Sequence, residues 1–524
     1  PYIRHIKIGR DIDGRPQTEI KKGEWQVTNP ENARAFSAVA YFFGKNLYDR
    51  LKVPIGLINS SWGGTNIETW ISREGFESSS EFRDLIARMP VFDVNAIDGP
   101  IGAAITKRVE SVQGSPLTPF DQNQFMSIGF DDSKLPSLVQ PKYWEGQSLG
   151  ETDGVVWVRK SFTLTSEQAA RSAKLLLAKI DDEDVTYING VQVGATAQWN
   201  ADRRYDVPGG VLNPGLNVVT VRITDNGGGG GMYGDAKDVR LDLGDSSVDL
   251  SGIWKFHVES VKFGVNVNQF PSLAYNAMIN PLIPYSFRGV IWYQGEANNG
   301  RAYQYRTAFP LLIEDWRKKW KSDFPFYFVQ LATYRQPGNS NEGCPWAELR
   351  EAQTMTTSVS GTGMVVTTDI GNPDNIHPVN KQDVGRRLAA LAFNRTYKLK
   401  MVDSGPTYSS MKVSGNQVSV AFAGIGGGLK SSLGKKVGGF EIAGADQVFY
   451  PADAVLEGNS VIVTSDKVAS PVAVRFGWLG DASANSLFNK EGFPAVPFRT
   501  DDWKTVTNGV KYAIPDMMRE INPD

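Results

Sequence analysis

The chain has 524 residues, of which 41% are hydrophobic and 21% charged, and its formal net charge is −2. This composition is that of a globular protein, and the length predicts about three domains because a single hydrophobic core stops growing well below it. The near-balanced charge argues against a nucleic-acid or anionic-membrane partner, and no apolar run reaches the ~20 residues that cross a bilayer. Cys344 is the single cysteine, which excludes an internal disulfide.

The first part of the chain, residues 1–111, alternates between strand and helix signals. Isoleucine spacing predicts a strand at 3–8, and apolar residues at helical spacing follow over 36–47. A second buried strand, Val53–Asn59, runs into the glycine-rich loop Ser60–Asn66. The two glycines of this loop carry no side chain, so its N–H groups can approach a ligand closely. The loop fits an oxyanion donor and a plain tight turn equally well.

Between residues 112 and 262 the pattern changes to short strands separated by turn residues, as in 155–162 and 216–223. This pattern predicts an inserted β-sandwich of jelly-roll type. Strand and helix alternate again over 263–400, which predicts a mostly parallel sheet built with the first part of the chain. After residue 401 the helix signals stop, and alternating apolar residues predict a C-terminal β-domain over 401–524.

One strand-end loop carries residues with the spacing of a catalytic pair. Asp374 precedes His377 by three residues, after the predicted strand 363–368. Across a tight turn such a carboxylate can accept a hydrogen bond from one ring nitrogen and leave the other free to take a proton. The same spacing also occurs where the two side chains merely hold a loop. Cys344 is a candidate nucleophile that would use His377 as its base, although a lone thiol is more often a small buried side chain.

Three strand-end loops together resemble the sialate O-acetylesterase family of the SGNH hydrolase superfamily. These loops are Ser61–Thr65, Trp292–Glu296 and Asp374–Pro378, and the resemblance extends through 53–72, 275–296, 346–353 and 487–494. It implies an α/β fold: a flavodoxin-like SGNH hydrolase domain with an inserted β-sandwich and a C-terminal β-domain. It implies a serine esterase that removes O-acetyl groups from sialic acids or, in relatives, from other sugars. No metal or cofactor is required for that chemistry.

The resemblance also implies roles for individual residues. Asp374 and His377 match the Asp-x-x-His element of the family. By this resemblance His377 would act as the general base, and Asp374 would orient its imidazole ring. Gly64, through its backbone N–H, and Gln294, through its side-chain amide, match the positions expected to supply oxyanion contacts. The alternative for Gln294 is a structural amide that pins its loop. For Glu296 we prefer loop support to contact with a sugar hydroxyl, because a carboxylate beside an oxyanion would oppose it.

Two residues in the stretch 346–353 are candidate glycan contacts. Trp346 would stack on a sugar ring, and Arg350 would pair with the carboxylate of a sialic acid. A buried tryptophan and a surface arginine are the commoner interpretations of such residues.

The sequence departs from the family at its nucleophile. The family carries the nucleophilic serine in a Gly-Gln-Ser-Asn segment after the first strand, and this sequence contains no such segment. Ser148 lies in a partial match, Gly-Gln-Ser-Leu, inside the predicted sandwich, whereas Ser60 and Ser61 lie in the right domain but on the second motif. We therefore expect the nucleophile on a missing or cleaved N-terminal segment that precedes Pro1.

Two alternative functions remain open at this point. One is an acetyl esterase acting on another polysaccharide such as xylan, and the other is a non-catalytic glycan-binding protein that has lost the nucleophile. The expected partner is an acetylated sugar, with neither nucleic acid nor membrane. The family resemblance implies a secreted, periplasmic or lysosomal location.

Overall fold

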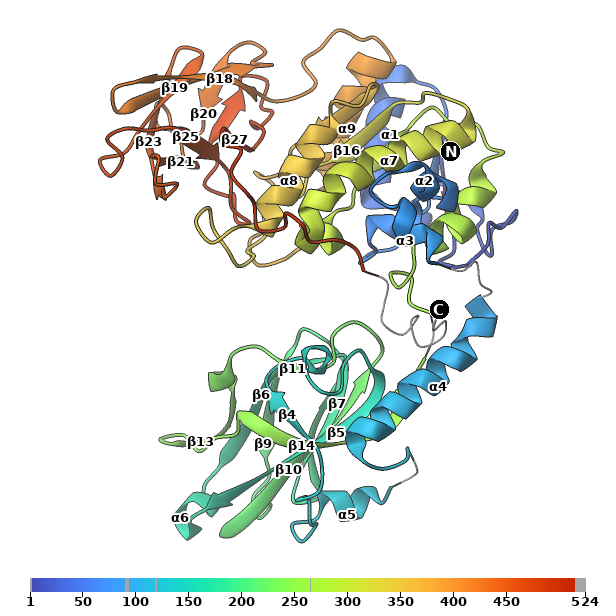
Figure 1. The fold of residues 1–524 in the computed structure, drawn as a ribbon, viewed down its shortest axis with the longest axis vertical. Coiled ribbons are helices and arrows are strands. Elements are labelled where there is room, and N and C mark those ends of the chain that lie inside the picture. The colour runs from blue at the N-terminus through green and yellow to red at the C-terminus, as the bar shows by residue number, and fades with distance from the viewer. Residues whose placement is uncertain (1, 90–93, 118–119, 264, 514–524) are drawn as a thin grey trace. The chain divides into compact units, whose positions relative to one another are not determined.

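The protein is described by a computed structural model (Figure 1). By their contacts, residues 94–265 form one compact unit, called the inserted unit below, and residues 1–93 with 266–514 form a larger unit. The inserted unit includes the helix α4 (Val94–Gln113), so it begins earlier than the boundary expected at residue 112. The ranges that the structure describes are 2–89, 94–117, 120–263 and 265–513.

The first sheet of the larger unit has three strands in the order β2-β1-β3. β1 (Ile3–Lys7) runs parallel to β3 (Ile55–Asn59), and the short β2 (Trp25–Val27) pairs with β1 in the antiparallel direction. The helix α1 (Ala38–Leu51) connects β1 to β3. It begins where the Ser37 hydroxyl accepts a hydrogen bond from a backbone N–H of the first turn, as helix N-caps do. The two strands predicted in this part of the chain are confirmed.

The second sheet of the larger unit is wholly parallel, in the order β15-β16-β17. β15 (Val290–Trp292) is connected to β16 (Phe326–Val329) by the long helix α7 (Ala302–Trp320). β16 is connected in turn to β17 (Thr362–Val365) by α8 (Pro345–Thr356). The predicted alternation of strand and helix is confirmed, because each parallel pair requires a crossover and a helix supplies it. The fold of this unit is therefore mixed α/β.

The two sheets share one layer of helices, formed by α1 and α9 (Lys381–Leu391). Gly385 allows α9 to approach α1 closely, since a Cβ at that position would lie 2.6 Å from the Cβ of Phe42. Ile55 of β3 and Ile291 of β15 pack against the same buried cluster, which contains side chains from both helices. β3 and β15 are also the end strands of their sheets, each with a strand partner on one side among the described residues.

The inserted unit contains two antiparallel sheets. Its longest strands are β5 (Asp153–Leu164), β10 (Gly215–Asp225) and β14 (Gly252–Lys262), in a six-stranded sheet of order β4-β14-β5-β10-β7-β8. The other sheet has the order β11-β6-β12-β13, with β9 also on β6. The strand signals found in the sequence are confirmed; packing of the two sheets as a sandwich stays a prediction. The remaining bounds are β4 Ser137–Gln140, β6 Ala173–Asp181, β7 Glu183–Ile188, β8 Val191–Thr196, β9 Asp202–Val207, β11 Gly231–Tyr233, β12 Val239–Asp242 and β13 Ser247–Asp249.

The C-terminal part of the larger unit is built of short antiparallel strands around its own apolar core, as the sequence predicts. After the last strand, residues 500–513 form neither helix nor strand and run back along α8 and α7 (Figure 1). We call these residues the return segment. Across the described ranges, no helix has both the length and the apolar character of a membrane span. The strands are β18 Thr407–Ser414, β19 Gln417–Ala423, β20 Leu429–Ser431, β21 Phe440–Ala443, β22 Phe449–Pro451, β23 Asp453–Glu457, β24 Ser460–Thr464, β25 Ala473–Phe476, β26 Leu487–Asn489 and β27 Phe498–Arg499.

Candidate active site

Gln294, directly after β15, connects two of the loops that the sequence analysis identified. Its Nε2 donates to the carbonyl oxygen of Thr65 at 2.9 Å and to Oδ1 of Asn298 at 2.7 Å, and its Oε1 accepts from the Tyr305 hydroxyl at 2.9 Å. Both N–H bonds of the amide are used, so none is left for an oxyanion. These bonds favour the structural amide that was the alternative for Gln294, and its oxyanion contact stays a prediction.

A buried polar network behind Gln294 holds the same two loops. Asn298 accepts a hydrogen bond from the backbone N–H of Ile67 at 2.8 Å and donates to Glu68 at 2.9 Å. Arg301 donates to the other oxygen of the Glu68 carboxylate, also at 2.9 Å. Sequence reasoning did not assign these three side chains. The available signal was an acidic residue, Glu68, beside the apolar Ile67 and followed by Trp70, which fits a buried carboxylate that needs partners.

Gly64 lies at an open turn of the loop that follows β3. Its φ of +79° is in the left-handed region, and a Cβ built on Gly63 or Gly64 would meet nothing within 4 Å. The Gly64 carbonyl accepts a hydrogen bond from Asn268 Nδ2 at 2.9 Å, whereas its N–H has no partner among the described residues. A backbone N–H in open space remains available to a ligand. The predicted oxyanion role of Gly64 stays a prediction.

Asp374 and His377 both lie on the loop between β17 and α9, as expected, but they do not form the expected hydrogen bond. Asp374 Oδ1 instead accepts from Arg335 Nη1 at 2.7 Å, and the carboxylate side chain is 74% exposed. The backbone N–H of His377 donates to Asn375 at 2.8 Å, and its side chain is exposed. The Arg335 guanidinium, on the loop after β16, therefore binds the Asp374 carboxylate that we expected to bind the His377 imidazole. The catalytic role of His377 stays a prediction.

Glu296 is the carboxylate that interacts electrostatically with His377. Burial raises the pKa of Glu296, while hydrogen bonds from backbone N–H groups and the nearby charges of Lys381 and His377 oppose that rise. Burial also lowers the pKa of Lys381, against the effect of Glu296, and its Nζ lies 5.1 Å from the ring centroid of Tyr293. Tyr293 and Glu296 follow β15, His377 precedes α9, and Lys381 is the first residue of α9. The backbone hydrogen bonds agree with the predicted loop support by Glu296.

The two predicted glycan contacts are buried in the interior. Trp346 is 2% exposed and its Nε1 donates to the carbonyl of Ala332 at 2.9 Å. Arg350 is 1% exposed and donates to four main-chain carbonyls, two at 331–332 and two at 479–480. Burial lowers the pKa of Arg350 to about 10. Glycan contacts require side chains at the surface, so both predictions are corrected: the two residues are parts of the core.

The three serines considered as nucleophiles show no contact that would activate their hydroxyl groups within the described ranges. The Ser60 hydroxyl donates to the Met278 carbonyl at 3.0 Å, and the Ser61 hydroxyl donates to Asn59 Oδ1 at 2.7 Å. Ser148 is exposed on the inserted unit. Within the described ranges none of the three hydrogen-bonds to a histidine. Cys344 is fully buried, and burial raises the pKa of its thiol, which disfavours the reactive thiolate.

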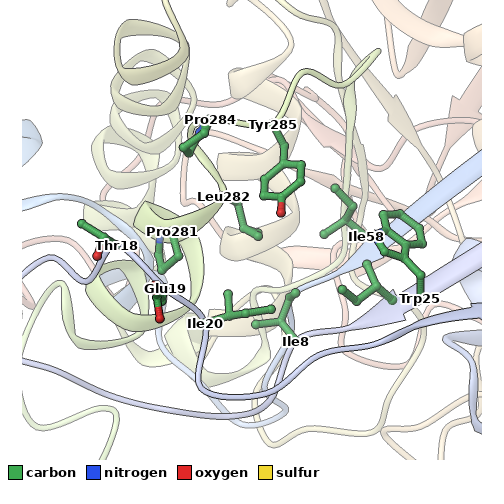
Figure 2. A pocket seen from close by; sticks show the side chains of 11 residues that line it. Ile8, Thr18, Glu19, Ile20, Trp25, Ile58, Pro281, Leu282, Pro284 and Tyr285 are labelled. Carbon is green, nitrogen blue, oxygen red and sulfur yellow. The ribbon is translucent and has the colours of Figure 1, made fainter.

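A pocket of about 450 Å³ lies beside the first sheet. Figure 2 shows its walls, formed by apolar side chains of β1, β3 and the turn 281–285, with the aromatic rings of Trp25 and Tyr285. Glu19 is the one charged residue among those drawn, and no predicted site residue is among them. In the part of the chain that the structure describes, no three His, Cys, Asp or Glu side chains are grouped to hold a metal ion.

The parallel strands and the polar loops at their carboxyl ends thus define an α/β protein with a candidate active site at the strand ends. Residues 264–394 match the family model "Carbohydrate esterase, sialic acid-specific acetylesterase". The resemblance stated from the sequence is confirmed over these residues. The matched stretch contains β15, β16, β17 and α9, and with them Gln294, Glu296 and His377.

Two curated relatives and one solved structure are similar to this chain. Sialate O-acetylesterase of Mus musculus is 39% identical over 136 residues, 22% of this chain and 25% of the relative. The Homo sapiens enzyme of the same name is 37% identical over 136 residues, 22% of this chain and 26% of the relative. The matched part thus spans about a quarter of the length of these relatives. A carbohydrate acetylesterase of Xanthomonas citri is similar over 96% of this chain and 74% of its own, with 28% identity and a TM-score of 0.59.

Proposed function

We propose that this protein is a serine esterase that removes O-acetyl groups from sialic acids or related acetylated sugars. The observation that carries the proposal is the coincidence of the matched family domain, residues 264–394, with the loops that hold Glu296 and His377. The similarity of nearly the whole chain to a carbohydrate acetylesterase supports the same activity. We also propose a flavodoxin-like SGNH arrangement for the larger unit, supported by its parallel strands and by the helices that cross between them.

The nucleophile of this proposal sits on an additional strand between β3 and β15. Both strands end their sheets, and Ile55 and Ile291 pack against one shared core, which supports placing the two free edges beside the same space. A parallel strand inserted there would satisfy the backbone groups of both edges. Its carboxyl end would emerge between the loop of Gly64, after β3, and the loop of Gln294 and Glu296, after β15. We propose that a segment other than residues 1–524 supplies this strand and its serine.

Each step of the reaction then has a group to perform it. The serine Oγ attacks the acetyl carbonyl carbon, and His377 takes its proton. The Gly64 N–H donates to the oxyanion that forms. The sugar hydroxyl leaves with the proton from His377, and a water molecule activated by His377 then releases acetate from the acyl-enzyme. Glu296 balances the imidazolium charge, and Asp374 takes part only when it leaves Arg335.

Acetate release from O-acetylated sialic acid by the full-length protein tests the proposal, with the His377→Ala variant as control. Catalytic release that the substitution abolishes supports the esterase. Binding of the acetylated sugar without any release supports the alternative, a glycan-binding protein. Acetylated xylan is assayed in parallel, because the Xanthomonas citri relative is a carbohydrate acetylesterase and the acetylated sugar could be another polysaccharide. The secreted, periplasmic or lysosomal location stays a prediction.

A further inference from the structure

Asn268 holds the turn that contains Gly64 from both ends. Its Nδ2 donates to the Gly64 carbonyl at 2.9 Å, and its Oδ1 accepts from the backbone N–H of Asn66 at 2.7 Å. A single side chain thus fixes two peptide groups of a loop that lies about two hundred residues away in sequence. Without it, an open glycine pair would be free to rotate, because glycine adopts positive and negative φ with similar ease.

Tyr512 of the return segment holds Asn268 in turn. Its hydroxyl lies 2.7 Å from the carbonyl oxygen of Gln269, to which it donates, and 3.3 Å from that of Asn268. The ring is 9% exposed, the backbone N–H of Tyr512 donates to Gln304 at 2.7 Å, and the Arg301 guanidinium lies 5.2 Å from the ring centroid. The phenol is therefore fixed by contacts of its own and can act as a rigid support.

The return segment itself is anchored on α8. The Glu348 carboxylate accepts hydrogen bonds from the backbone N–H groups of Val506 and Thr507, each at 3.0 Å. The Thr507 hydroxyl also accepts a hydrogen bond from the backbone N–H of Tyr303 at 3.0 Å. A buried carboxylate that binds two backbone N–H groups is a strong attachment. The path from α8 through the return segment to the Gly64 turn therefore consists of hydrogen bonds that begin at the buried Glu348 and Thr507 and end at the exposed Gly64.

We propose that Asn268 is a positioning residue for the Gly64 N–H, and that the return segment, through Tyr512, keeps Asn268 in its working position. The inference rests on the proposed esterase function. Oxyanion donors act only when they already point at the place where charge develops, so a loop of two open glycines needs an external support. The C-terminal β-domain would thereby contribute to catalysis without touching the substrate.

The test compares Asn268→Ala, Asn268→Asp and Tyr512→Phe in the full-length protein with a matched control, Asn341→Ala. Asn341 makes the same two-sided contact with the backbone of Phe449, at 3.0 and 2.7 Å, and has no contact with the Gly64 turn. On p-nitrophenyl acetate we expect kcat to fall about 10- to 100-fold in the three test variants, with KM changing less than about threefold. Asn341→Ala should keep kcat while losing a similar amount of thermal stability.

Hydrogen exchange of the peptide covering residues 62–70 provides a readout that does not require activity. Exchange should become faster in the Asn268 and Tyr512 variants and stay unchanged in Asn341→Ala. Unchanged exchange and unchanged kcat in Asn268→Ala would overturn the positioning role and leave the esterase proposal intact. A wild-type protein that releases no acetate would overturn the esterase proposal, and the exchange data alone would then decide whether Asn268 holds the loop.

Discussion

Gln294 and Thr65 follow two different strands, and a hydrogen bond of 2.9 Å from the Gln294 side-chain amide to the Thr65 carbonyl joins them. The other N–H of this amide binds Asn298, so the side chain is saturated. We expect Gln294→Ala to lower the free energy of unfolding by about 1 to 3 kcal/mol, because it leaves buried partners unpaired. The effect on kcat should stay below about tenfold. Urea unfolding and steady-state kinetics on the same preparation measure both.

The comparison variant for this position is Gln294→Glu, which keeps the shape and loses both N–H donors at neutral pH. It should destabilise at least as much as the alanine variant, since a carboxylate would face two acceptors. A loss of kcat above about 10²-fold at unchanged stability would restore the oxyanion role.

His377→Ala in the full-length protein should lower kcat on a small acetyl ester by at least about 10³-fold, as expected when the base of a triad is removed. Because the His377 side chain is exposed, the melting temperature should hardly change. Activity assays and thermal unfolding check both statements. Turnover at the wild-type rate would remove His377 from the mechanism.

Glu296 and Asp374 can be distinguished by their effect on kcat/KM. Glu296→Gln removes a negative charge that interacts with His377, so kcat/KM should fall about tenfold or more. Asp374→Asn removes a carboxylate that is paired with Arg335, so kcat/KM should stay within about threefold of the wild-type value. The reverse pattern would return the orienting role to Asp374.

Arg350→Lys should be strongly destabilising, because an ammonium group cannot replace a planar guanidinium that serves four carbonyls in two segments. We expect a loss of about 2 to 4 kcal/mol, since each hydrogen bond to a charged group contributes about 1.5 to 3 kcal/mol. Arg288→Lys, at a position outside this network, is the control. Weaker sugar binding at unchanged stability would restore the role in carboxylate recognition that the sequence suggested.

Asp225, in the inserted unit, makes the stability of the protein dependent on pH. It is fully buried, its Oδ2 has no hydrogen-bond partner among the described residues, and burial raises its pKa to about 7. The folded state therefore holds a proton that the unfolded state releases near pH 4, so stability is lost as pH rises from about 4 to 7. Asp225→Asn should raise stability at pH 8 by about 2 kcal/mol and change little at pH 4.

Thermal unfolding at pH 4 and pH 8 measures this difference. Asp206→Asn, which changes an exposed carboxylate of the same unit, is the control and should behave like the wild type at both pH values. Burial also raises the pKa of Glu145 to about 7, so Glu145→Gln should shift stability in the same direction as Asp225→Asn. A destabilised Asp225→Asn variant at pH 8 would contradict the assignment of an unfavourable buried charge.

The spacing of apolar residues along the chain predicted the strands and helices. The contacts of the site residues depend instead on residues far away in the sequence. The apolar runs around 290–293 and 326–331 predict strands, and both strands were found, β16 buried and β15 half-buried. The burial of Arg350 depends instead on residues 479–480, and the saturation of Gln294 depends on Thr65, more than two hundred residues earlier. No local signal reports such contacts. For the same reason the contact of Asn268 with the Gly64 turn could not be predicted from the sequence.

The insertion of residues 94–265 separates the strands of the larger unit during synthesis on the ribosome. At the usual rates of translation, ~5 to 20 residues per second, synthesis of the inserted unit alone delays the chain that completes the core of β1, α1 and β3 by about 10 to 35 s. The nascent inserted unit, which is continuous in sequence, can fold in that interval, whereas the first strands must wait with an apolar face uncovered. A molecular chaperone that binds extended apolar chain should therefore protect residues 1–93 in particular, and stalling translation near residue 265 should make the emerging product prone to aggregation.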